Sequence, residues 1–254
     1  MIRGIYTAAS AMLVQMGLQD VVGNNLANAN TTAYKRDEVS FKARIDKTMY
    51  RVGMAPGGPV DGRSLIGKLS TGSQVAEIRP NLAQGELRPT DNPLDLGIRG
   101  KGFFLVENDN GEQFLTRAGN FLVDRERNLV DATGARVVGD GGPLVMPERA
   151  TVLISQEGVI TAGSKVVGRL AIREVARPAE QLEKVGVGRF RLKAGEMVAS
   201  RSEVHQGYLE ASDVSPTHEM VKMVTAMRSY ESSSKAMQTH DELLGKAVNE
   251  LGRV

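Results

Sequence analysis

Cysteine and tryptophan are absent from this chain of 254 residues. Without cysteine the protein can form no disulfide, no thiolate nucleophile and no cysteine-based zinc site. Aromatic residues make up only 4% of the sequence, which argues against a surface that stacks nucleic-acid bases on aromatic rings. Because glycine is abundant, with 28 residues, we expect thin, turn-rich β structure whose stability comes from packing and assembly.

Long apolar runs are also missing. No stretch comes near the ~20 residues that a membrane-spanning helix needs. The N-terminal stretch is interrupted by Gln15, Gly17 and Asp20, so it lacks the continuous apolar segment of a secretory signal. We therefore expect no direct membrane insertion, and either a cytoplasmic protein or export by a route that removes nothing.

Charges of the two signs nearly cancel, with a formal net charge of +2. The basic residues between Lys35 and Lys47 are interleaved with Asp37, Glu38 and Asp46, which weakens any field directed at phosphates. We interpret this segment as a solvated face and expect no nucleic-acid partner.

Residues that could carry chemistry are scattered. The histidines His205, His218 and His240 lie late in the chain and show no metal-ligand spacing. The glycines of 97–102 do not form a dinucleotide-binding fingerprint, and they lead into an expected strand instead of a helix. The acidic stretch 107–111 lacks the first ligand of a calcium loop, and no nucleophile elbow is present. The sequence therefore predicts no catalytic residue, no cofactor and no metal site.

The first helix is indicated by apolar side chains at alternating spacings of three and four. Ile5, Ala9, Met12 and Met16 follow this spacing, which is typical of a heptad-like helical seam. The pattern fades in the Asn- and Thr-rich stretch 24–32, where such side chains favour caps and turns. We predict a helix from 2 to about 28.

A longer and more regular seam lies near the C-terminus. After Ser215 and Pro216, which suit a helix start, we predict a helix from about 217 to 250. Its seam consists of Met220, Met223, Met227, Tyr230, Ser234, Met237, Asp241, Leu244, Val248 and Leu251. Methionine tolerates imperfect partners, so the seam suits a surface repeated in several environments. The alternative is an ordinary helix that faces a core.

The middle of the chain lacks helical periodicity. Residues 31–74 are predicted to form an extended arm or linker, because 53–59 is too rich in glycine and proline to hold regular structure. Within 75–214, strands at 103–107 and 113–117 flank Asn110 and Gly111, which predicts a hairpin with a type I′ turn. Further strands are predicted at 121–124, 129–131, 136–138, 151–154, 166–174 and 189–193.

The predicted fold class is therefore α+β. The terminal segments 1–30 and 215–254 pair as a coiled-coil-like helical domain, 31–74 is a linker, and 75–214 is an antiparallel β domain.

Several motifs together resemble one known family. They are IYTAASAM at 5–12, NNLANANT at 24–31, AYKR at 33–36, PLDLGIRGKGFF at 93–104, TRAGNF at 116–121, VGRL at 167–170 and QGYLEASDV at 206–214, followed by Glu219, Met220, 228–231 and Lys235. This set resembles the flagellar axial family, which contains rod, hook and hook-associated proteins. The resemblance spans nearly the whole chain.

The resemblance implies a structural subunit of the bacterial flagellar basal-body rod, and not an enzyme. The run at 168–170 and the closing DELLGK at 241–246 look most like the proximal-rod F subunit, with a distal-rod or hook-type subunit as the alternative. Such a subunit polymerises into the drive shaft that carries torque from motor to hook. One departure from the family pattern lies at Asp213, Ser215 and Pro216.

The implied partners are copies of the chain itself, other flagellar rod subunits and the flagellar type III export apparatus, which reads an uncleaved N-terminus. The implied location is the basal body within the cell envelope, with terminal helices forming an inner tube and β domains an outer layer. We expect the assembly interface to include Ile5, Ala9, Met12, Met16, Asn24, Asn25, Leu26, Ala27, Asn28, Met220, Met223, Met227, Tyr230, Met237, Leu244 and Val248.

Two hypotheses of other classes stay open. A cell-wall-acting hydrolase would need two opposed carboxylates in a cleft. A soluble coiled-coil adaptor would be helical and dimeric by itself, whereas a rod subunit is expected to stay monomeric until it polymerises.

Overall fold

The computed structural model describes residues 2–44, 46–51, 54–55, 58–59, 64–70, 72–147, 152–163 and 165–251. The chain divides into two compact units. The first, called the helical unit, comprises Met1–Asn24, Glu38–Arg79 and Thr217–Val254. The second, called the β unit, comprises Asn25–Asp37 and Pro80–Pro216.

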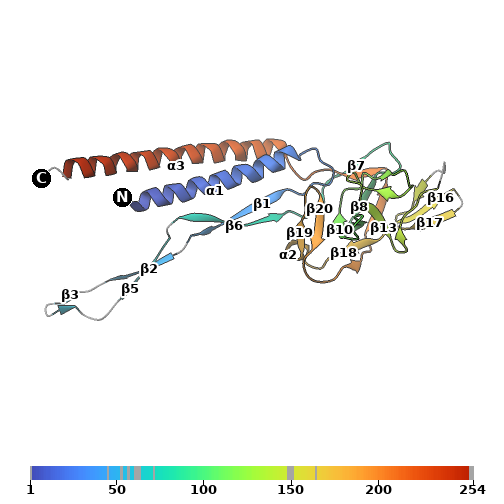
Figure 1. Ribbon diagram of the computed structural model, residues 1–254, viewed down its shortest axis with the longest axis horizontal. Helices are drawn as coiled ribbons and strands as arrows, with labels where there is room; N and C mark the ends of the chain where they lie inside the picture. The colour runs from blue at the N-terminus through green and yellow to red at the C-terminus, as the bar shows by residue number, and fades with distance from the viewer. Residues whose placement is uncertain are drawn as a thin grey trace. The chain divides into compact units, whose positions relative to one another are not determined.

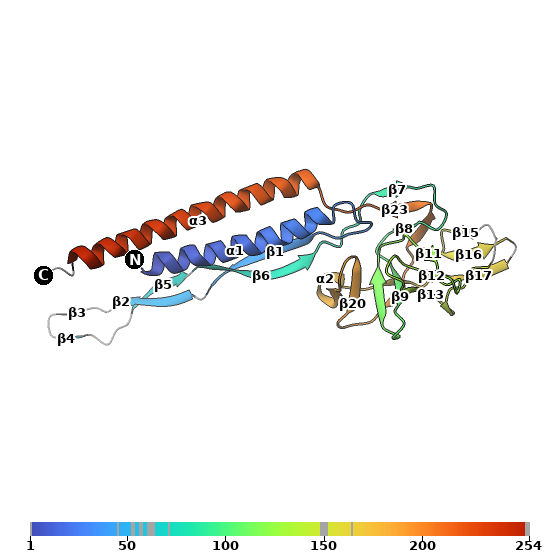
Figure 2. The same cartoon turned by 45° about the horizontal axis from the view of Figure 1, so that its top comes forward.

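The helical unit is built on two long antiparallel helices, α1 (Ile2–Ala27) and α3 (Pro216–Leu251), which lie side by side in Figures 1 and 2. Their antiparallel order follows from contacts near both ends, because Gly4 lies beside His240 and Gly23 beside Met223. A Cβ atom at Gly4 would lie 2.5 Å from the His240 imidazole, so the missing side chain permits this close approach. Both predicted helices and their pairing are confirmed.

The segment predicted as an arm contains paired strands. In the helical unit β1 (Asp37–Ala43) pairs with β6 (Ser73–Pro80), β2 (Asp46–Arg51) with β5 (Ser64–Ser70), and β3 (Met54–Ala55) with β4 (Gly58–Pro59). The short β3–β4 pair corrects the expectation that 53–59 holds no regular structure, while Gly53, Pro56 and Gly57 lie outside the described residues. The predicted boundary at 75 falls inside β6.

The β unit contains a ten-stranded sheet whose main order is β11-β12-β13-β9-β10-β20-β19. In addition, β18 pairs with β9 and β21, and β14 pairs with β13. Every pairing is antiparallel, as predicted. The strands are β9 (Phe103–Glu107), β10 (Gln113–Thr116), β11 (Leu122–Val123), β12 (Leu129–Val130), β13 (Arg136–Gly139), β14 (Gly142–Pro143), β18 (Ile172–Glu174), β19 (Leu182–Lys184), β20 (Arg189–Leu192) and β21 (Val198–Ala199).

Smaller elements complete the β unit. A three-stranded sheet consists of β15 (Val152–Ile154), β16 (Val159–Ala162) and β17 (Lys165–Arg169), and one short helix, α2, spans Pro178–Gln181. The last strands, β22 (Glu203–Gln206) and β23 (Tyr208–Glu210), pair with the first, β8 (Leu96–Arg99) and β7 (Leu87–Pro89). The two ends of the unit's sequence are thus joined by backbone hydrogen bonds.

The hairpin at 103–117 forms with Glu107 opposite Gln113, but its predicted turn type is wrong. The Gly111 amide donates to the Asn108 carbonyl oxygen at 2.9 Å, and Gly111 has a φ of 77°. Among the described non-glycine residues only Ala33 and Arg127 have positive φ, so Asn110 lacks the conformation that a type I′ turn requires. The connection is a type I turn followed by a left-handed glycine.

The strand predicted at 166–174 is interrupted. β17 ends at Arg169 and β18 begins at Ile172, because β17 pairs with β16 and β18 pairs with β9. The buried residues between them, Leu170 and Ala171, mark the change from one sheet to the other. Apolar side chains continue through the break, which is why the sequence predicted one strand.

The hydrophobic core of the β unit lies on both faces of β9. Phe104 packs on one face, where its ring meets Phe121 edge-to-face with centroids 5.0 Å apart. Phe103 and Leu105 pack on the opposite face with Phe190. Burial on both sides explains why β9 is a continuous apolar run instead of an alternating one.

Candidate assembly surface

Each long helix has side chains that are buried within the helical unit. Ala8, Val14 and Val22 of α1 are buried, as is Ala226 of α3. Met223 is half-buried, and its terminal methyl group lies 3.7 Å from the position that a Cβ atom at Gly23 would occupy. The contact between Met223 and Gly23 packs α3 against α1.

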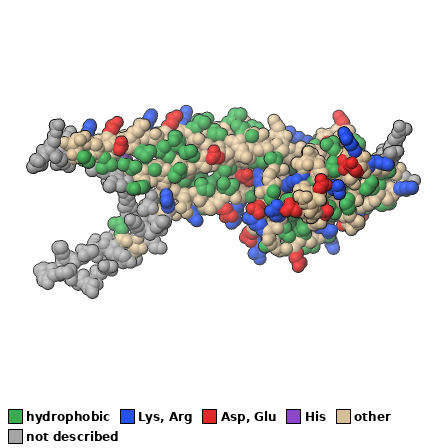
Figure 3. Space-filling model, in the orientation of Figure 1, with side chains coloured by type: hydrophobic (Ala, Val, Ile, Leu, Met, Phe, Trp, Pro, Cys, Tyr) green, Lys and Arg blue, Asp and Glu red, His purple; other side chains and the backbone are tan. Residues whose placement is uncertain are grey.

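A second apolar face of each helix is exposed. On α1, Tyr6, Leu13 and Met16 share one face by their spacing and are 48% to 68% exposed; we call them the α1 patch. On α3, the α3 patch is likewise one face and is 49% to 60% exposed. The α3 patch consists of Met220, Val221, Val224 and Met227. Figure 3 shows hydrophobic side chains gathered along the helices.

The structure divides the predicted seam residues into two sets. The half-buried set contains Ile5, Ala9, Met12, Met223, Tyr230, Met237 and Leu244. The exposed set contains Met16, Met220, Met227 and Val248. Side chains of the exposed set are available to another chain, whereas those of the half-buried set are partly covered within this one.

The Asn-rich part of the predicted interface has a different arrangement. Asn25 is buried, its amide donates to the Asp37 carbonyl oxygen at 3.0 Å, and its Oδ1 accepts from the Asp37 amide at 2.9 Å. The Tyr34 hydroxyl also donates to Asn25 Oδ1, at 3.2 Å. The Asn25 side chain thus holds the turn that follows α1. Its neighbours Asn24 and Ala27 are exposed, and Leu26 and Asn28 are half-buried.

A buried ionic cluster in the β unit was missed by sequence reasoning. The Lys35 ammonium and the Glu210 carboxylate form an ion pair, and both side chains are almost fully buried. Arg117, also buried, lies 3.5 Å from the same carboxylate through Nη1. Burial lowers the pKa of the Arg117 guanidinium, and the nearby Glu210 charge opposes that shift. The cluster therefore contains two cations and one anion.

Backbone groups make hydrogen bonds with all three charged side chains of this cluster. Lys35 Nζ also donates to the Ala83 carbonyl oxygen at 2.5 Å, and Arg117 Nη2 donates to the Gly100 carbonyl oxygen at 2.6 Å. The Gly85 amide donates to Glu210 Oε1 at 2.8 Å. These hydrogen bonds offset part of the cost of removing the charges from water.

Backbone contacts extend the cluster into a clasp between 33–36 and 210–213. The Ala33 amide donates to the Glu210 carbonyl oxygen at 2.8 Å, and the Arg36 amide donates to the Asp213 carboxylate at 2.7 Å. Burial raises the pKa of the Asp213 carboxyl group, and the hydrogen bond from Arg36 opposes this effect. We call 33–36 and 210–213, with the side chain of Arg117, the clasp. The signal that could have indicated it is the presence of Lys35 and Glu210 directly after apolar and aromatic residues.

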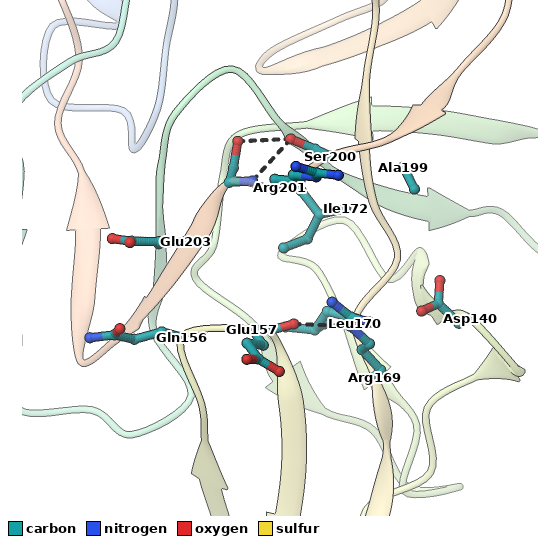
Figure 4. Close-up of a pocket in the computed structure, with 11 residues that line it drawn as sticks. Asp140, Gln156, Glu157, Arg169, Leu170, Ile172, Ala199, Ser200, Arg201 and Glu203 are labelled. Atoms are coloured by element: carbon teal, nitrogen blue, oxygen red, sulfur yellow. Dashed lines mark hydrogen bonds between the residues drawn. The ribbon is translucent and has the colours of Figure 1, made fainter.

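A polar hollow of about 460 Å³ lies elsewhere in the β unit (Figure 4). Arg169 Nε donates to the Glu157 carbonyl oxygen at 3.1 Å, and the hydroxyl groups of Ser200 and Ser202 lie 2.8 Å apart. Its lining includes arginines and carboxylates, so charges of both signs offset one another.

Among the described residues, no three histidine, aspartate or glutamate side chains are grouped so that they could hold a metal ion. In the part of the chain that the structure describes, no helix is both long and apolar enough to cross a membrane.

Three protein-family models match this chain, two at its ends and one in its middle. The family model "Flagella basal body rod protein" matches residues 5–35, "Flagellar hook protein FlgE/F/G D1 domain" matches 97–162, and "Flagellar basal body rod FlgEFG protein C-terminal" matches 205–250. The flagellar basal-body rod protein FlgG of Borreliella burgdorferi is 33% identical over 266 residues, covering 98% of each chain. The chain belongs to the flagellar basal-body rod family. It is a structural rod protein and not an enzyme.

Other relatives of this rod protein carry the subunit name FlgF instead of FlgG. FlgF of Caulobacter vibrioides is 32% identical over 258 residues and FlgF of Salmonella typhimurium is 29% identical over 263 residues, covering 99% and 96% of each chain. The family and its place in the basal-body rod are therefore confirmed at the level that FlgF and FlgG share. The clasp joins the two terminal matches, since Lys35 lies in the first and Glu210 in the last.

Proposed function

We propose that this rod protein polymerises through its terminal helices with copies of itself and with other rod subunits, and so forms part of the shaft that transmits torque from motor to hook. The observation that carries the proposal is the exposed apolar face that α1 and α3 each retain after they have packed together. Exposed apolar faces of this kind mark interaction sites in soluble proteins. In this proposal 1–30 and 215–254 carry assembly, 31–74 links, and 75–214 is the outer domain.

The free energy that burial of the two patches contributes suits repeated assembly. Full burial of a Val, Leu or Met side chain contributes about 1.5–3 kcal/mol. Side chains of the two patches are already about half covered, so roughly 1 kcal/mol each remains to be gained from a neighbour. A single contact of this size is modest, whereas a polymer repeats it in every subunit.

Within the rod, we propose the proximal position of an F-type subunit. The support is the likeness of the run at 168–170 and of DELLGK at 241–246 to that subunit. A distal-rod subunit is the second candidate, because the FlgG of Borreliella burgdorferi is 33% identical and the FlgF of Caulobacter vibrioides 32%. We further propose export through the flagellar type III apparatus.

Genetic complementation distinguishes the two positions. The gene for this chain would be expressed in flagellated bacteria that lack either their FlgF or their FlgG, and swimming in soft agar would be measured. The proposal predicts that motility returns in the strain without FlgF. Restoration only in the strain without FlgG would assign the distal rod instead.

A further inference from the structure

We propose that the α1 patch of one copy packs on the α3 patch of the next copy, in a head-to-tail contact. This inference rests on the proposed polymerisation and adds which surfaces meet, between which partners and in which register. The occupant of each patch is therefore a second copy of this chain.

The two patches lie at different levels along the helix pair. Gly4 is level with His240 and Gly23 with Met223, so Met16 of the α1 patch is level with a point of α3 beyond Met227. The α3 patch begins at Met220, beside the last turns of α1. Within one copy the patches are displaced from each other by about nine residues, or roughly 14 Å at 1.5 Å per residue. They therefore cannot cover each other in the same chain.

Over the described length of α3, the α3 patch is the largest group of exposed apolar side chains on one face, and it matches Leu13 and Met16 of the α1 patch in kind. Between Met227 and Glu242 the exposed residues of α3 are polar or charged, apart from the small Ala236. Leu243 and Val248 are exposed as well, but they are five residues apart and therefore lie on different faces of the helix. The α3 patch, in contrast, presents four apolar side chains within two turns.

Charge supports the same register. If α1 and α3 of neighbouring copies run antiparallel, Met16 opposite Met220 brings Leu13 close to Val224. Asp20 then lies opposite the first turn of α3. Asp20 is the sole charged residue between Gly4 and Tyr34, and the dipole of a helix N-terminus favours a carboxylate. Glu219, the acidic residue of that first turn, is buried and paired with Lys222.

Two different patches that bind each other form a heterologous contact. Such a contact leaves one free patch at each end of any chain of copies, so growth continues into a ring or an open helix. If each patch bound its own kind instead, the contact would close on itself as a symmetric pair. The observed pair of unlike patches favours continued growth.

Disulfide trapping tests this inference without interference, because the natural chain has no cysteine. Leu13→Cys and Val224→Cys would be introduced singly and together, and basal bodies would be isolated, oxidised and separated on non-reducing gels. The double variant is expected to form a ladder of linked copies, and each single variant to stay monomeric. A bond within one copy is excluded, because a disulfide needs Cα atoms about 4.4–6.8 Å apart and the two positions are displaced by about twice that distance along the axis.

Matched controls separate the outcomes. Leu13→Cys with Gln238→Cys pairs the α1 patch with an exposed polar position of α3 and is expected to give no ladder. Met16→Cys with Met220→Cys repeats the test at the neighbouring predicted contact, in case the first pair does not assemble. If the chain is present in basal bodies but single variants form dimers, or neither double variant forms a ladder, the head-to-tail contact is wrong. If the chain is absent from basal bodies, the proposed function itself fails.

Discussion

Replacing Glu210 by glutamine should destabilise the β unit more than removing either of its cationic partners. The Glu210 carboxylate accepts from Lys35, Arg117 and the Gly85 amide, and all three side chains of the ionic cluster are buried. Glutamine keeps the shape of the side chain but removes the counter-charge that the two buried cations share, and only the carboxylates of Asp213, near Lys35, and Glu174, near Arg117, remain. Removal of one partner from a buried ion pair typically costs about 3–5 kcal/mol. Against a total stability of about 5–15 kcal/mol, this loss is large.

Lys35→Met is expected to cost less. It leaves one cation, Arg117, beside one anion, and the Glu210 carboxylate keeps its hydrogen bond from Gly85. We expect a loss of about 1–3 kcal/mol, chiefly from the Ala83 carbonyl oxygen that loses its donor. The order of the two losses thus follows from the excess of cations in the cluster.

Urea unfolding of the purified monomer, followed by circular dichroism, measures both losses. Glu86→Gln is the matched control, because the ion pair of Glu86 with Arg88 lies in the same unit but is about 70% exposed, and such pairs contribute about 0–1 kcal/mol. Equal losses for Glu210→Gln and Lys35→Met, or a loss below about 1 kcal/mol for Glu210→Gln, would refute the reasoning.

Three further outcomes are expected. Gly119→Ala should destabilise the β unit by at least about 2 kcal/mol, because the new Cβ would lie 1.7 Å from the Leu96 carbonyl oxygen. Gly141→Ala, whose new Cβ would lie in open space, should change the stability by no more than about 0.5 kcal/mol, and thermal unfolding compares the two variants. Burial raises the pKa of the Asp213 carboxyl group above its ordinary value of 3.8, so the contribution of Asp213 to stability should fall as the pH rises through 3.8 and on through the folded-state pKa. Asp213→Asn should flatten this pH dependence in urea titrations at different pH. Limited proteolysis of the isolated monomer should remove the terminal helices and leave the β unit with 28–37 still bound. Loss of that segment would contradict the clasp.

The sequence predicted those parts of the fold that depend on local repetition. Both long helices follow the spacing of Ile5, Ala9 and Met12 and of the methionines after Met220, and their ends were placed within a few residues. Strands such as 103–107 were visible because both faces of β9 are buried. The strands β1 and β6 gave little signal, because most of their side chains are exposed.

The remaining features depend on contacts between residues far apart in the sequence. The clasp joins Lys35 to Glu210, and no local pattern connects two charges at that separation. Met223 and Met227 are both methionines of the predicted seam, yet Met223 lies against α1 and Met227 is exposed. Which stripe of an apolar helix turns inward is decided by its partner, and the sequence of one helix does not contain that information.

The central claim, that exposed faces of the terminal helices assemble the rod, is tested most directly by charging the α3 patch. Met220→Glu with Met227→Glu changes two half-exposed side chains, so the monomer should lose little stability, while each contact in the polymer would have to bury two new charges. We predict a melting temperature close to that of the natural chain together with loss of incorporation into basal bodies and of motility. Met223→Glu is the matched comparison, because Met223 packs inside the chain and its variant should loosen the helix pair itself. A large fall in the melting temperature of the Met220 and Met227 double variant, or normal incorporation and swimming, would contradict the account.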